Sequence, residues 1–227
     1  MITIVATLGG GNYGIPRPYY RLCEKLKKEK ISGGAKEIVA LFPENGMPRQ
    51  EIFEKTKLLI LPGGMDVSPM RYGEIPAVSC GPSDPHLEYF DTFFLRKFIE
   101  RGTPVFGICR GFQTLNVFFE GRLIQHLRTH PNSGEYRENL VHKVYSPDFS
   151  AKKGTGTLLE VNSLHHQAVP EEFLGEGLTS LLGCNTQEGF ISEAFIHNSL
   201  PIAGVQWHPE EIMDSFSLGL IAKILGE

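Results

Sequence analysis

The sequence predicts an α/β protein with three layers, in which helices cover both faces of a mainly parallel sheet. Short runs that are apolar throughout alternate along the chain with longer segments whose apolar residues recur every three to four positions. Continuously apolar runs are typical of strands that are buried on both faces. With 227 residues, of which 41% are hydrophobic, the chain can bury a sizeable core, and we expect a single domain over residues 1–227.

The first half of the chain is expected to alternate strands and helices. Apolar and β-branched runs predict strands at residues 2–7, 37–41, 58–61 and 105–108. Helical periodicity predicts helices at residues 18–30, 86–100 and 112–119.

The second half is less regular. Residues 121–156 are polar and have no long period, so loops with one or two short strands are expected there. Further strands are predicted at residues 158–162, 190–196 and 202–206, with a turn-rich segment before Gly189 and a hairpin at Asn198 and Ser199. An amphipathic helix over residues 210–225 closes the pattern.

Composition excludes several partners. The net charge of −4 gives no electrostatic reason to expect nucleic acid or an anionic membrane. No apolar run approaches the roughly 18 residues that span a bilayer, and residues 1–7 hold no Lys or Arg before their apolar stretch, so no signal peptide is expected. The widely spaced Cys23, Cys80, Cys109 and Cys184 predict reduced thiols in a cytoplasmic protein.

The segment around Cys109 carries the strongest chemical signal. The apolar run at residues 105–108 leads into Cys109, a helix is expected directly after it, and Gly107 and Gly111 lie two positions away on either side. This pattern is a nucleophile elbow with Cys in place of Ser. A helix N-terminus favours the thiolate, and the backbone amide of Arg110 would point toward a reacting carbonyl. The alternative interpretation of Cys109 is a small side chain buried at a strand end.

A histidine and a carboxylate follow the strand predicted at residues 202–206. His208 and Glu210 point the same way in an extended chain, because they are two positions apart, and Pro209 fixes the chain direction between them. We expect Glu210 to hold one ring nitrogen of His208 while the other faces Cys109.

The other histidines are interpreted differently. His165 and His166 are adjacent, so they would not both face one site on a regular strand. The rest are interpreted as core or surface residues: His86, His126, His130, His142 and His197. The spacings of His, Cys and carboxylate residues match no common zinc pattern, so neither a metal nor another cofactor is expected.

Several further segments strengthen the pattern. Cys109, Gly111 and Gln113 form Cys-x-Gly-x-Gln, and the His-Pro-Glu at residues 208–210 follows about a hundred residues later. Residues 61–73, 116–125 and 161–169 add a glycine loop, a helix continuation and an Asn-Ser-x-His motif. Over residues 58–211 the chain resembles class I glutamine amidotransferases and, more narrowly, the γ-glutamyl hydrolase-like branch, peptidase family C26.

This resemblance implies a fold and several roles. It implies the class I glutamine amidotransferase-like fold with a flavodoxin-like core. It implies that Gly64 supplies a second oxyanion amide opposite Arg110. It also implies that Gln113 and the backbone at Ser163, Leu164 and His165 hold the α-substituents of a γ-glutamyl group. The first forty-odd residues match poorly, the loop at residues 9–14 is not a phosphate loop, and residues 128–156 are not recognisable.

The leading hypothesis is hydrolysis of a γ-glutamyl amide or isopeptide bond through a γ-glutamyl thioester on Cys109. The expected partner is a small-molecule γ-glutamyl substrate, with a homodimer left open. One alternative is a glutaminase subunit of a glutamine amidotransferase, which would pass ammonia to a separate synthetase. Another is a catalytically inactive binding or regulatory protein, against which the complete set of Cys109, His208 and Glu210 argues.

Overall fold

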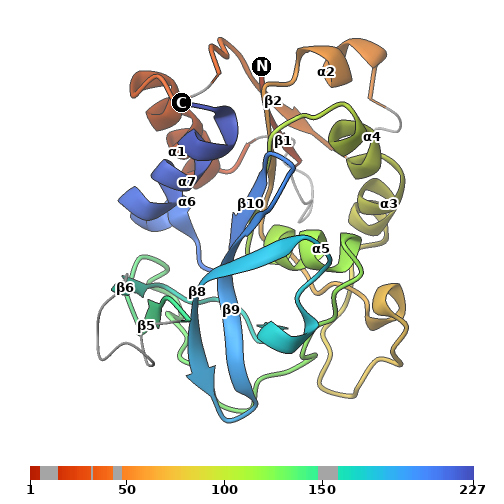
Figure 1. Cartoon of the computed structure of the whole chain (residues 1–227), viewed down its shortest axis with the longest axis vertical. Coiled ribbons are helices and arrows are strands. Elements are labelled where there is room, and N and C mark those ends of the chain that lie inside the picture. The colour runs from red at the N-terminus through yellow and green to blue at the C-terminus, as the bar shows by residue number, and fades with distance from the viewer. Residues whose placement is uncertain (6–14, 32, 43–47, 148–157) are drawn as a thin grey trace.

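The computed structural model describes residues 1–5, 15–31, 33–42, 48–147 and 158–227. Within these ranges ten strands join one sheet (Figure 1). In chain order they are β1 (Ile2–Val5), β2 (Ile38–Leu41), β3 (Leu58–Leu61), β4 (Val105–Ile108), β5 (His142–Tyr145), β6 (Leu158–Val161), β7 (Val169–Pro170), β8 (Leu178–Thr186), β9 (Gly189–His197) and β10 (Ile202–Val205). Across the sheet the order is β2-β1-β3-β4-β10-β9-β8-β5-β6, and β7 pairs with β9.

One half of the sheet is parallel and the other half is antiparallel. β2, β1, β3, β4 and β10 run in the same direction. Beyond β10, the strands β9, β8, β5 and β6 pair antiparallel. The predicted α/β class with a parallel core is therefore confirmed, although the sheet as a whole is mixed. The hairpin predicted at Asn198 and Ser199 is also confirmed, because it joins the antiparallel neighbours β9 and β10.

Helices cover both faces of the parallel half, as predicted. They are α1 (Arg17–Lys28), α2 (Gln50–Lys55), α3 (Pro85–Phe93), α4 (Leu95–Glu100), α5 (Arg110–Phe118), α6 (Pro209–Ile212) and α7 (Ser215–Leu225). Side chains of α1 and α7 pack with Leu58 and Ile60 of β3, and those of α2 to α5 pack with Leu59 and Leu61. Successive residues of β3 thus serve two cores, because a strand alternates its faces. Figure 1 shows α1 and α7 on one side of the strands and α3 to α5 on the other.

The observed helices differ from the expected ones in three places. The helix predicted over residues 86–100 is two helices that meet at Phe94. The helix predicted over residues 210–225 is divided at Met213, which is left-handed with φ 53°, and α7 begins anew because Asp214 caps it by accepting from the Ser217 N–H. Helix α2 was not anticipated from the sequence.

The turn-rich segment predicted before Gly189 is wrong for residues 178–186, which form β8. Register shifts at Ser180, Leu182 and Gly183 interrupt the pairing of β8 with β9. A bulge removes the strict alternation that marks a strand in sequence. Residues 6–7 of the first predicted strand, the glycine loop at 9–14 and residues 148–156 lie outside the described residues.

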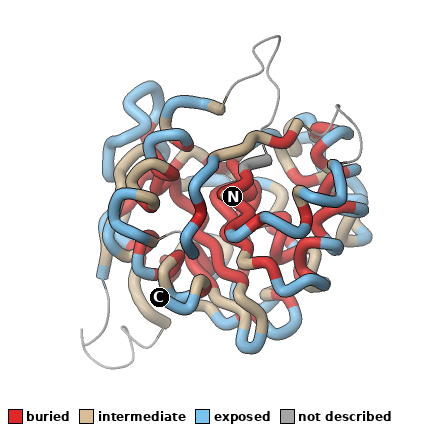
Figure 2. The backbone as a smooth tube through the Cα atoms, turned by 90° about the horizontal axis from the view of Figure 1, so that it is seen from above, coloured by how far each residue is buried: buried red, intermediate tan, exposed pale blue. Residues whose placement is uncertain are grey.

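Burial follows this layering. Figure 2 shows the buried stretches of the backbone in the interior, surrounded by exposed turns and helix surfaces. In the described part of the chain, no helix has both the length and the apolar character needed to cross a membrane.

Glycines bring α5 into direct contact with the sheet. A Cβ at Gly111 would lie 2.2 Å from the Leu61 carbonyl oxygen, and a Cβ at Gly107 would lie 2.6 Å from the Gly111 carbonyl carbon. The first turn of α5 therefore rests on the backbones of β3 and β4. This contact fixes where the helix begins relative to the strand before it.

Gly111→Ala should destabilise the protein by roughly 1–3 kcal/mol or more. The added methyl group would press against the Leu61 backbone, which cannot move aside as a side chain can. Gly219→Ala is a matched control, since Gly219 lies in α7 with nothing within 4 Å of an added Cβ. Removing a helical glycine there should stabilise by about 0.4–1 kcal/mol. Denaturant unfolding of both variants measures the difference, and equal stabilities would contradict the proposed contact.

Candidate active site

Cys109 occupies a strained position between β4 and α5. Its backbone has φ 52° and ψ −104°, and it is one of four described non-glycine residues with positive φ. Such a conformation is unfavourable for a residue with a Cβ and persists only where the surroundings enforce it. The side chain is 6% exposed at the N-terminus of α5. The elbow predicted from the glycine spacing is present in the structure.

His208 lies next to Cys109 because β4 and β10 are neighbours. Val205 of β10 pairs with Ile108 of β4, and the Cys109 N–H donates to the Val205 carbonyl at 2.9 Å. Cys109 and His208 therefore both follow strands that end at the same carboxyl edge of the sheet. Asn162 holds the His208 backbone, accepting from its N–H at 3.0 Å and donating to its carbonyl at 3.3 Å.

Glu210 binds one nitrogen of the His208 ring. The distance between Nδ1 and Glu210 Oε1 is 2.8 Å, and both side chains are buried. A carboxylate accepts only, so Nδ1 carries a hydrogen and Nε2 is turned toward the cysteine side. Among the described residues no hydrogen-bond partner lies at Nε2, which leaves it available for proton transfer.

The charge state of His208 depends on these neighbours. Burial alone would lower the pKa of the ring, but interactions with the Cys109 sulfur and with the Glu210 carboxylate raise the pKa to about 10. At neutral pH the His208 ring is therefore protonated, beside the Cys109 sulfur and the Glu210 carboxyl group. That arrangement combines a nucleophile with a proton donor.

A glycine turn after β3 closes the other side of the site. A Cβ at Gly63 would lie 2.9 Å from His208 Cε1 and 3.6 Å from Cys109 Cβ, so only glycine fits there without displacing the ring. The Gly63 N–H donates to the Tyr19 hydroxyl at 2.8 Å. Burial, and then the Glu210 charge, raise the pKa of Tyr19 well above its usual value, which keeps it a neutral phenol.

Tyr19 is a positioning residue that the sequence did not reveal. It lies on the apolar face of α1, where the periodicity alone marks it as a core residue. Its hydroxyl nevertheless holds the glycine turn beside the two reactive side chains. A buried Tyr usually pairs its hydroxyl, and this is the only signal in the sequence that could have indicated a polar role.

A cavity of about 500 Å³ opens onto these groups. Cys109, His208 and Glu210 line it with Gly64, Leu164 and Arg137. Arg137 comes from the unrecognised segment and binds Glu211 at 2.7 Å between Nε and Oε1. It places a half-exposed guanidinium at the cavity.

Of the two predicted oxyanion residues, Gly64 lines this cavity and Arg110 could contribute only its backbone. Gly64 lines it directly. The Arg110 side chain turns away into the core, where it binds Asp91 at 2.7 Å and Thr114 at 3.1 Å. Its backbone N–H belongs to the first turn of α5, where amides have no acceptor within the helix. The backbone of Arg110, rather than its charge, is therefore available to the site.

The predicted substrate-binding residues are only partly gathered. Leu164 lines the cavity. Gln113 is buried and donates its amide to the Gln167 carbonyl and to Gln206 Oε1. The Ser163 N–H donates to the Ser133 hydroxyl, and the Ser163 carbonyl accepts from the Ser133 N–H. The contact of Gln113 and Ser163 with substrate stays a prediction.

The His165 side chain belongs to another cluster and does not line the cavity at Cys109. Its ring lies tilted against that of His130, with 4.6 Å between centroids, in a cluster around Glu193. Only its backbone could serve the cavity that Leu164 lines. His166 lies apart from its neighbour and binds Asp66 at 3.0 Å.

A second group of Cys, His and Glu exists, formed by Cys184, His142 and Glu193. Cys184 lies inside β8 and donates its thiol to Glu193 at 3.3 Å. Burial and the Glu193 charge raise the pKa of this thiol far above its usual value. A protonated thiol within a strand, without a helix N-terminus, does not suit a nucleophile.

Comparison with known proteins indicates the family. The family model for Peptidase C26 matches residues 23–210. A candidate glutamine amidotransferase-like protein of Lactococcus lactis is 37% identical over 158 residues, which cover 67% of this chain and 65% of that protein. The γ-glutamyl-γ-aminobutyrate hydrolase PuuD of Escherichia coli is 28% identical over 186 residues, covering 76% of this chain and 71% of that one.

The chain spans only part of the length of these relatives. The chain spans 65% of the Lactococcus relative and 54% of a candidate glutamine amidotransferase of Mycobacterium tuberculosis, to which it is 30% identical over 174 residues and 74% of its own length. A solved glutamine amidotransferase from Thermotoga maritima superimposes with a TM-score of 0.59 at 15% identity, over 92% of this chain and 75% of that one. This likeness supports the fold alone.

The titration of His208 provides a test of the site. Its pKa of about 10 exceeds the ordinary 6.5, so the ring charge stabilises the fold fully below pH 6.5, and this contribution is lost as pH rises toward 10. NMR of the ring should show the raised pKa. In Cys109→Ser it should fall, because burial is then opposed by Glu210 alone. An unchanged value in Cys109→Ser would mean that the sulfur does not face the ring.

Proposed function

The chain belongs to the Peptidase C26 family, and on this premise we propose that it is a cysteine-dependent hydrolase that cleaves γ-glutamyl amide or isopeptide bonds through a γ-glutamyl thioester. The observation that carries the proposal is the strained Cys109 at the start of α5, opposite a His208 ring whose Nδ1 lies 2.8 Å from Glu210. These are the nucleophile, the proton carrier and the orienting carboxylate of an acyl-transfer triad.

In the first half of the reaction the Cys109 thiolate attacks the γ-carbonyl carbon. The carbonyl electrons move to oxygen, where the backbone amides of Arg110 and Gly64 would stabilise the charge. His208 then gives its Nε2 proton to the amide nitrogen, and the C–N bond breaks. The amine leaves, and the γ-glutamyl group remains as a thioester on the sulfur.

In the second half water replaces the amine. His208, now neutral, takes a proton from the water that attacks the thioester carbonyl. The tetrahedral intermediate collapses, the C–S bond breaks and glutamate leaves. Glu210 keeps the ring oriented through both halves, while the buried setting excludes other nucleophiles. The thiolate and imidazolium are restored.

The cavity supports an amine leaving group that bears a carboxylate. Arg137 lines the same cavity as Cys109 and His208. Its Nε is bound by Glu211, while a guanidinium offers further N–H donors suited to a second carboxylate. The name of the Escherichia coli relative, γ-glutamyl-γ-aminobutyrate hydrolase, describes such a substrate. We therefore extend the proposal to γ-glutamyl conjugates of amino acids.

The nucleophile is tested by trapping. Cys109→Ser should lose turnover by on the order of 10⁴-fold or more, as triad nucleophiles do, while folding normally. An electrophilic glutamine analogue should add its mass at Cys109 in the wild type. Cys184→Ala should still be labelled at Cys109. Labelling at Cys184, with Cys109 untouched, would assign the chemistry to the other group.

The leaving-group site is tested with a substrate pair. Arg137→Ala should lower kcat/KM about tenfold for γ-glutamyl-γ-aminobutyrate, because a half-exposed charge contact is modest. It should have little effect on γ-glutamyl-butylamide, which lacks the carboxylate. Arg128→Ala is a control at an exposed arginine outside this cavity.

Equal losses for both substrates would remove the proposed role of Arg137. A comparable kcat/KM for free glutamine, with ammonia released, would instead favour a glutaminase subunit. The names of the Lactococcus and Mycobacterium relatives keep that alternative in view. Addition of a synthetase partner that stimulates glutamine hydrolysis would then decide between the two.

A further inference from the structure

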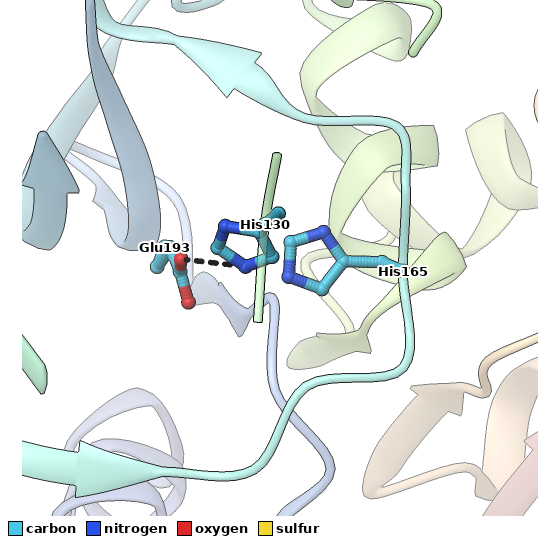
Figure 3. Close-up of side chains that lie close together, drawn as sticks. All are labelled: His130, His165 and Glu193. Carbon is cyan, nitrogen blue, oxygen red and sulfur yellow. Dashed lines mark ion pairs between the residues drawn. The ribbon is translucent and has the colours of Figure 1, made fainter. Parts of the chain in front are cut away.

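A buried carboxylate lies at the centre of a histidine cluster in the antiparallel half of the sheet. Glu193 of β9 is 0% exposed. His130 and His165 approach it from two loops (Figure 3), while His142 of β5 and Cys184 of β8 lie on strands near it. These residues are far apart in the sequence, and only the fold brings them together.

Hydrogen bonds within the protein satisfy one side of this carboxylate only. His142 Nε2 lies 2.9 Å from Glu193 Oε1, and the Cys184 thiol donates to the same oxygen at 3.3 Å. Among the described residues, Glu193 Oε2 and the Nε2 atoms of His130 and His165 are buried with no hydrogen-bond partner. Buried polar atoms without partners are costly and require an explanation.

The tautomer of His165 indicates what kind of partner is lacking. Its Nδ1 lies 3.0 Å from the Gln167 carbonyl, which only accepts, so Nδ1 carries the hydrogen. In the neutral ring Nε2 then presents a lone pair to the cluster. A carbonyl that orients the far nitrogen of a ligand histidine is the common arrangement around protein-bound metals.

The donor types of the cluster suit a cation. Two imidazoles and one carboxylate come together there, and both kinds of group are common zinc ligands.

We propose that His130, His165 and Glu193 bind one divalent cation of the zinc class, with His142 and Cys184 holding the carboxylate from its other side. The site shares no residue with the proposed triad, and it does not depend on the hydrolase function. It departs from the expectation of no metal, which rested on spacing along the chain alone.

The geometry is close to that of a bound ion. One donor atom from each of the three residues lies within 4.8 Å of the others. Ligands of a tetrahedral zinc lie about 3.4 Å apart, given bonds of about 2.1 Å, so the side chains would close by roughly an ångström. His130 is on a loop, and its Nε2 is already 3.7 Å from Glu193 Oε1.

The donor set selects among metals. Imidazole nitrogens favour zinc and its transition-metal neighbours, whereas calcium and magnesium prefer oxygen ligands. Two histidines and one glutamate leave the fourth position of a tetrahedral ion to water. His130, His142 and Cys184 also line a cavity of about 450 Å³, which gives an ion a path from solvent.

The bound ion would fix the loop that serves the active site. His165 directly follows Leu164, which lines the active-site cavity. Two residues before Leu164, Asn162 holds the His208 backbone through both of its amide atoms. A cation on His165 therefore anchors the segment from which His208 is positioned.

Zinc binding is measured on the full chain carrying Cys109→Ser, which removes the other Cys–His pair that could bind zinc. Protein stripped with a chelator is titrated with Zn²⁺ against a chromophoric chelator, and bound metal is counted by mass spectrometry. We expect one zinc per chain. Zinc at about a hundredfold over its dissociation constant should raise the unfolding midpoint by roughly 5 °C or more.

Matched variants locate the ion. His165→Gln and His130→Gln should lose the zinc equivalent and the midpoint shift. His142→Gln should weaken zinc about 10–100-fold, as changes around ligands do. His166→Gln should retain zinc, although it removes the adjacent histidine that binds Asp66 and His126. Glu193→Gln should also lose zinc, and His130→Gln, which changes a loop residue, provides the test if Glu193→Gln fails to fold.

Three results would overturn the proposal. The first is less than a tenth of an equivalent of zinc with no midpoint shift. The second is that His165→Gln and His130→Gln both retain the zinc equivalent. This holds whether His166→Gln loses zinc or no variant does. A thiolate-to-metal band in the Co²⁺ form that disappears in Cys184→Ala would also overturn the assignment, since Cys184 would then be a ligand.

Discussion

The positive φ of Cys109 is the constraint on which the rest of the site depends. A residue with a Cβ adopts this conformation only where its surroundings enforce it. Here the elements before and after Cys109 both do so. Before it, β4 is locked between β3 and β10. After it, α5 rests its first turn on the β3 backbone through Gly111. The packing of the parallel half of the sheet therefore fixes the position of the thiol. The neighbouring β10 places His208 at the same edge.

Buried charge among the described residues is divided into separate groups. Asp91 binds both Arg71 and Arg110 behind α5, so the arginine of the elbow motif neutralises a core carboxylate rather than a substrate. Glu210 is matched by His208, and Glu193 by its histidines. Each carboxylate has its own cation or donor, as burial of charge demands. The groups can then serve different purposes without competing for the same partners.

The parallel half of the sheet and the elbow at Cys109 could be predicted because both leave local signals in the sequence. A fully apolar strand, flanking glycines at Gly107 and Gly111, and the His-Pro-Glu after β10 can each be read within a few residues. The bulged β8 was missed because its register shifts remove the period of two. Tyr19 was missed because a residue on an apolar helix face gives no sign of what its hydroxyl touches. The cluster at Glu193 was missed because its members come from two loops and three strands, so no spacing along the chain records it.

The order of the strands has a consequence for how the chain matures. β10 lies in the middle of the sheet, between β4 and β9, yet follows the other nine described strands in the sequence. Until it is made, β4 has an open edge of buried apolar residues that can pair with another chain. Pairing elements this distant in sequence is entropically slow. Pairing of β10 with β4 therefore completes the sheet and brings His208 to Cys109 in one step. A chain that lacks β10 would expose both the Cys109 thiol and an unpaired strand edge.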